Sequence, residues 1–128
     1  MTGQIDNTIA RAVAVIGLAG VALIHLLDAP GTYADTRYIF FLYLALIAGC
    51  LGAAALLLRA PARLGWMAAV ALSSLPFIGY VLSRSTGLPG DMGDIGNWIE
   101  PLGLASLYVE ACVFALGLYG LARFRRTR

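Results

Sequence analysis

A single glutamate lies deep inside the last long apolar run of the chain. The run from Leu102 to Phe124, LGLASLYVEACVFALGLYGLARF, is about 23 residues long, enough to cross a hydrocarbon core of roughly 30 Å at 1.5 Å per residue. Glu110 lies about 12 Å from its start. A carboxylate at that depth costs about 2.5 kcal/mol or more unless it is paired, protonated or facing a polar cavity. We therefore expect any function to lie near Glu110.

The helix face that carries Glu110 is otherwise made of small residues. At spacings of three and four it holds Gly103, Ser106, Val113, Gly117 and Gly120. Small residues allow a neighbouring helix to approach closely. The pattern predicts that Glu110 points into protein and away from lipid.

Other polar side chains are expected at the same depth or nearer the outer surface. His25 is near the end of the first apolar run with Asp28 one turn further, and Tyr80 and Arg84 form an i, i+4 pair. We predict a polar funnel in the outer half of a helix bundle. The predicted ligand-binding residues are His25, Asp28, Tyr80, Arg84, Glu100, Ser106 and Glu110.

A divalent metal ion is the candidate cofactor of this funnel. One imidazole and two carboxylates, from His25, Glu100 and Glu110, form a set that first-row metals accept. Against it, His25 and Glu110 differ by about 7 Å in depth at 1.5 Å per residue. Two simpler interpretations remain open. Arg84 neutralises Glu100 or Asp28, and a protonated Glu110 bonds to a hydroxyl of Tyr80, Ser73 or Ser74.

Composition indicates an integral membrane protein. Apolar residues make up 60% of the 128 residues and charged residues 12%, whereas soluble domains have about 45–50% and 25%. The basic residues are nine arginines, without the basic stripe that nucleic-acid binding requires. The partners we expect are the lipid bilayer and either a larger membrane complex or further copies of the chain. Cys50 and Cys112 lie in apolar runs without a CxxC motif, so buried apolar roles are favoured.

The chain is predicted to be one all-α domain, residues 1–128, forming a four-helix transmembrane bundle. Helices are expected at about 9–27, 38–58, 64–82 and 102–124. Pro30 and Gly31 predict a loop over 28–37, and glycine and proline predict a longer loop over 83–101. We expect that longer loop to fold back over the outer mouth of the bundle. A cleaved signal peptide is the competing interpretation of the first apolar run.

Arginine distribution predicts the orientation. Seven arginines fall on the side that holds both termini and the 59–63 turn, and two on the other, acidic side. By the positive-inside rule the termini are cytoplasmic, which gives an N-in, C-in protein. The absence of lysine and the richness in alanine, arginine and glycine suit a GC-rich bacterial genome, so we expect the bacterial cytoplasmic membrane.

Three features of the sequence are similar to those of a known family: His25, the segment SRSTGLPG (83–90) and the segment EPLGLASLYVE (100–110). In these features the chain resembles a family of small four-helix bacterial membrane proteins without assigned activity. The resemblance implies that the funnel residues belong together, and it implies no chemistry.

Three functions are compatible with these residues. The first is an outward-facing polar pocket that binds a cation, a proton or a small polar ligand. The second is an accessory or structural subunit of a larger membrane complex. The third is a membrane enzyme in which Glu110 and His25 act as acid and base.

Overall fold

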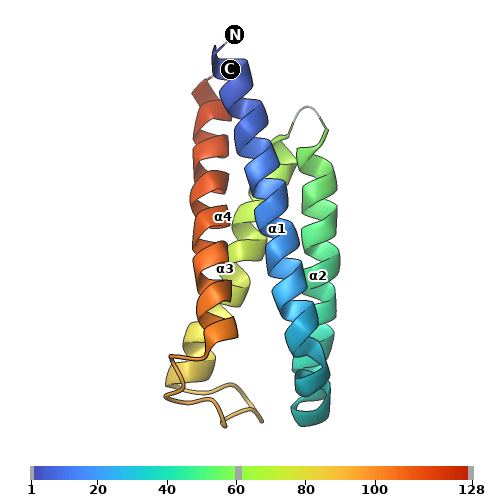
Figure 1. Cartoon of the computed structure of the whole chain (residues 1–128), viewed down its shortest axis with the longest axis vertical. Helices are drawn as coiled ribbons and strands as arrows, with labels where there is room; N and C mark the ends of the chain where they lie inside the picture. Colours follow the sequence, from blue (N-terminus) through green and yellow to red (C-terminus); the bar gives the residue numbers. More distant parts are fainter. Residues whose placement is uncertain (1, 60–61, 127–128) are drawn as a thin grey trace.

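Four antiparallel helices make up the part of the chain that the structure describes. The structure is a computed structural model that describes residues 2–59 and 62–126. Its elements are α1 (Thr2–Asp35), α2 (Arg37–Leu57), α3 (Arg63–Ser85) and α4 (Pro101–Arg126). Each helix packs beside the next, and α4 returns to α1 (Figure 1). The start of α1 and the end of α4 lie at one end of the bundle, and the α3–α4 loop lies at the other (Figure 1).

All four helices are long and apolar enough to cross a membrane. Large apolar side chains cover their outward faces, for example Ile16 at 70% exposure, Leu75 at 64% and Leu51 at 59%. A soluble protein of this size rarely exposes apolar surface so continuously. The predicted all-α class with four candidate membrane spans is confirmed, and the structure indicates a multi-pass membrane protein.

The predicted loop at 28–37 is wrong. Helix α1 continues through Pro30 and Gly31 to Asp35, and only Thr36 separates it from α2. Proline removes one helical hydrogen bond, but here Ala29 is buried against the bundle and the Thr32 hydroxyl donates to the Asp28 carbonyl at 3.0 Å. Packing and this bond hold the helix, and the extension brings further side chains to the outer end.

The other predicted boundaries differ less. Helix α2 agrees within one residue, α1 begins at Thr2, α3 continues to Ser85, and α4 covers 101–126. Residues 60–61 of the predicted 59–63 turn, and residues 127–128 of the arginine-rich tail, lie outside the described residues.

The small-residue face of α4 packs as predicted. Ser106, Glu110 and Val113 are buried. A Cβ built on Gly120 would lie 2.3 Å from the Trp66 ring, which shows how closely α3 approaches α4. Close packing of this kind is typical of helix interfaces in membranes.

The end of the bundle that holds the chain termini has a closed apolar core. Ala14, Leu18, Leu57 and Trp66 are all at most 1% exposed and belong to one buried cluster. There Arg11 donates from Nη2 to the Arg59 carbonyl at 2.6 Å, just beyond the end of α2. An arginine near the last carbonyls of a helix satisfies groups that lack helical partners. The polar side chains of the interior are therefore concentrated toward the opposite end.

Candidate ligand pocket

A cavity of about 800 Å³ opens at the end of the bundle that carries the α3–α4 loop. All four helices and the loop contribute to its wall. Six of the seven predicted ligand-binding residues line it: His25, Asp28, Tyr80, Arg84, Glu100 and Ser106. The structure therefore brings these six residues to one cavity, with Glu110 directly beyond Ser106.

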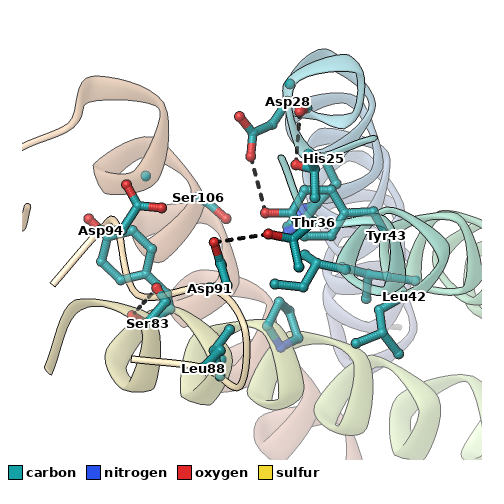
Figure 2. A pocket seen from close by; sticks show the side chains of 18 of the residues that line it. His25, Asp28, Thr36, Leu42, Tyr43, Ser83, Leu88, Asp91, Asp94 and Ser106 are labelled. Atoms are coloured by element: carbon teal, nitrogen blue, oxygen red, sulfur yellow. Dashed lines mark hydrogen bonds between the residues drawn. The ribbon is translucent and has the colours of Figure 1, made fainter. Parts of the chain in front are cut away.

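The α3–α4 loop covers part of the mouth, as predicted. Its Pro89 carbonyl accepts a 2.5 Å hydrogen bond from the Tyr38 hydroxyl, and Asp91 Oδ1 accepts one from Thr36 Oγ1 at 3.2 Å. Figure 2 shows Thr36 and Asp91 joined across the pocket. Of the large apolar side chains in the loop, Leu88 lines the pocket, whereas Ile95 and Trp98 are 46% and 41% exposed. The loop is thus held over the mouth by polar contacts to the α1–α2 corner together with Leu88.

Arg84 is buried at the start of this loop and is surrounded by acceptors. Its Nη2 donates to Glu100 Oε2 at 2.6 Å, and its Nη1 lies 3.3 Å from Asp94 Oδ2. Nε donates to the Asn97 carbonyl at 2.9 Å, and the guanidinium lies 4.4 Å from the centre of the Tyr80 ring. The expected neutralisation of Glu100 by Arg84 is confirmed. The charge of Arg84 is thus already compensated.

His25 lies on the opposite wall with its ring orientation fixed. Nδ1 lies 2.8 Å from the Val21 carbonyl oxygen, and because a carbonyl can only accept, Nδ1 carries the hydrogen. Nε2 is left as the nitrogen that can bond to a ligand. The ring meets Tyr43 edge-on at 4.8 Å, and the Tyr43 hydroxyl donates to Asp28 Oδ2 at 3.1 Å.

Glu110 lies below the pocket floor and is 1% exposed. Its Oε1 accepts a 2.7 Å hydrogen bond from Ser106 Oγ. Its Oε2 is buried without a hydrogen-bond partner among the described residues. Other expected partners are engaged elsewhere: Tyr80 donates to the Trp98 carbonyl, and the Ser73 and Ser74 hydroxyls donate to carbonyls of their own helix.

The predicted metal set of His25, Glu100 and Glu110 is not assembled. Among the described residues, no three His, Cys, Asp or Glu side chains are placed to hold a metal ion. Glu100 is bound to Arg84. Gly20 of α1 lies beside Val109 of α4, so His25, five residues further along α1, is about 7 Å nearer the mouth than Glu110.

Several pocket residues were not predicted from the sequence, among them Asp35, Thr36, Tyr43, Asp91 and Asp94. Tyr43 could have been found, because Ile39 and Cys50, at helical spacing from it, share its inward face. Thr36 lies in segment 28–37, which was wrongly predicted to be a loop, so its place in the pocket wall was not expected. Asp91 and Asp94 lie in an irregular loop, where no periodicity indicates which side chains turn toward a cavity.

Comparisons of the chain with protein-family models, curated proteins and solved structures found no match.

Proposed function

We propose that the protein binds a small organic cation in this pocket, from the outer side of the bacterial cytoplasmic membrane. One observation carries the proposal. The pocket is lined by five carboxylates, those of Asp28, Asp35, Asp91, Asp94 and Glu100, and by one guanidinium, Arg84. Both ion pairs in the described part of the chain are made by Arg84, to Asp94 and Glu100. Asp28, Asp35 and Asp91 are left to give the pocket a negative field.

Apolar lining favours an organic cation over a metal ion. Leu46, Leu72 and Pro76 line the inner part of the cavity, and their hydrocarbon side chains provide no ligands for a metal ion. A volume of about 800 Å³ is in the range of small-molecule sites, which combine apolar walls with a few polar groups. The aromatic ring of Tyr43 adds a surface on which a cationic group is stabilised.

Charge asymmetry supports an outward-facing pocket. Arg11 and Arg63 belong to the closed end, whereas the acidic pocket is at the other. With both termini cytoplasmic, as the positive-inside rule predicts, the pocket opens outside. The lipid bilayer is then the partner of the exposed apolar faces.

A matched pair of probes tests the charge requirement. Choline and 3,3-dimethyl-1-butanol have nearly the same shape, and only choline is charged. We expect choline to raise the unfolding temperature of the purified protein, because a ligand at about 100 times its Kd adds about 2.7 kcal/mol of stability. The neutral alcohol should have a much smaller effect. Tetramethylammonium and benzyltrimethylammonium extend the series in size.

Two variants locate the binding. Asp28→Asn, beside Tyr43 in the pocket wall, should weaken choline binding by about tenfold, the equivalent of about 1.4 kcal/mol. Asp35→Asn, on the exposed rim, should weaken it less. Equal stabilisation by choline and its neutral analogue would overturn the proposal. So would no stabilisation by any of the three cations, a result that favours the accessory-subunit function.

A further inference from the structure

Glu110 is the buried acid that the pocket does not use. Its carboxylate is beyond the cavity wall, with Oε2 unpartnered among the described residues. Ser106, one helical turn nearer the mouth, both lines the cavity and donates to Glu110 Oε1 (Figure 2 shows Ser106 at the pocket). The Ser106 hydroxyl is therefore the contact between the cavity and this acid.

Among the described residues, no comparable polar route leads from Glu110 to the closed end. On the same face of α4, Val113 packs against Gly17 of α1, and Gly117 packs against Val70 of α3. One turn further, Trp66 fills the space beside Gly120. These side chains carry no group that passes a proton along the bundle axis at this face.

The surroundings of Glu110 leave its charge uncompensated. Helix α2 places the Cys50 thiol close enough to interact electrostatically with it. Helix α1 presents Gly17 and Gly20 to α4 at this level, with His25 about 7 Å nearer the mouth. On α3 the hydroxyl of Ser73, which the sequence offered as a partner of Glu110, instead donates to the Ala69 carbonyl at 2.7 Å. Within the described part of the chain, an ionised carboxylate here has a single hydrogen-bond donor, Ser106, and this arrangement favours the uptake of a proton.

We propose that Glu110 is a proton-binding site that exchanges protons with the outer pocket through the hydroxyl of Ser106. In the uptake step Ser106 Oγ accepts a proton from a hydronium ion in the pocket, which becomes water, and passes its own hydroxyl proton to Glu110 Oε1. The serine is regenerated, one proton enters, and the carboxylate becomes a neutral carboxylic acid. Release follows the same bonds in reverse. The site does not depend on which ligand the pocket takes, so failure of the choline experiment leaves this inference standing.

Infrared spectroscopy of the protein in lipid reports the protonation of Glu110 directly. A protonated carboxyl has a C=O stretching band well separated from the bands of a carboxylate. We expect a wild-type band that disappears as the pH rises from mildly acidic to mildly alkaline, and that is absent in Glu110→Gln. The amide of that variant still accepts the Ser106 hydrogen bond. A Glu110 band that stays constant over the same pH range would show a permanently protonated structural group and overturn the proposal.

Exchange into deuterated water tests the role of Ser106. At mildly acidic pH the wild-type band should shift promptly, because the proton exchanges through the pocket. Ser106→Ala should slow the shift by about tenfold or more, since it removes the one hydrogen-bond donor to the acid. Ser106→Thr keeps a hydroxyl and should restore fast exchange.

Ser73→Ala is the matched control. Ser73 is also buried, but its hydroxyl donates within its own helix. This variant should exchange at the wild-type rate. Thermal unfolding of each variant shows whether the bundle is intact. Exchange in a folded Ser106→Ala protein as fast as in wild type would refute a route through Ser106.

Discussion

The Nη2 atom of Arg84 and the Oε2 atom of Glu100 lie 2.6 Å apart and connect the last turn of α3 to the residue before α4. The same guanidinium holds the Asn97 carbonyl, and the Arg84 carbonyl accepts a 2.7 Å hydrogen bond from the Gly96 amide. Both ends of the α3–α4 loop are thus fastened to one residue. The middle of the loop is then free to reach the α1–α2 corner and cover the pocket.

Arg84→Met should destabilise the protein by about 2 kcal/mol, because it removes the charged hydrogen bonds of the buried guanidinium to Glu100 and the Asn97 carbonyl, whereas the partly exposed carboxylates left behind can be solvated. Thermal unfolding measures the loss. Arg37→Met is the control, since Arg37 is exposed and lies 4.9 Å over the Tyr33 ring, and we expect less than about 0.5 kcal/mol there. Equal losses in both variants would contradict the role of Arg84.

Tyr38→Phe should loosen the loop without unfolding the bundle. The variant removes the hydrogen bond to the Pro89 carbonyl, which is worth about 1 kcal/mol, or about a fivefold higher population of the open loop. Amide hydrogen exchange around residues 88–91 should accelerate by that factor. Tyr108→Phe alters a tyrosine that is 73% exposed on α4 and should leave the rate unchanged. An unaltered exchange rate in Tyr38→Phe would show that contacts other than this hydrogen bond hold the loop in place.

The sequence predicted the inward direction of Glu110 because residues three and four apart share one helix face. It predicted the helices because the thickness of the bilayer fixes the length of an apolar span. It placed His25 and Arg84 at the correct end for the same reason. It could not reveal that Arg84 binds Asn97 and Asp94 as well as Glu100, because those contacts depend on the path of an irregular loop.

The error at 28–37 has a different origin. Pro30 and Gly31 are local signals for a break, but burial of Ala29 and the contact between the Tyr33 and Phe40 rings at 4.9 Å extend α1 to Asp35. Tertiary packing overrode local propensity. The predicted metal set was not assembled for a related reason. Arg84 already binds the Glu100 carboxylate, and the separation of these two residues in the sequence could not show that this ion pair would form.

Gly120→Ala should destabilise the closed end of the bundle. Its Cβ would overlap the buried Trp66 ring, and overpacking of this kind costs about 1–3 kcal/mol. Gly52→Ala is the matched control in α2, where an added Cβ meets nothing within 4 Å, and it should be neutral or stabilise by up to about 1 kcal/mol. Thermal unfolding in detergent compares the two. Tolerance of alanine at position 120 would mean that α3 and α4 pack less closely.

Accessibility labelling tests the proposed orientation. In a background with Cys50→Ala and Cys112→Ala, Gly93→Cys places a thiol in the exposed pocket loop and Asn7→Cys places one at the opposite end. A membrane-impermeant maleimide should label Gly93→Cys in intact cells and Asn7→Cys only after the membrane is disrupted. The reason is the arginine excess at the end that holds the termini, which the positive-inside rule keeps cytoplasmic. The reverse labelling pattern would show that the protein has the opposite orientation. The acidic pocket, with its route to Glu110, would then lie on the cytoplasmic side.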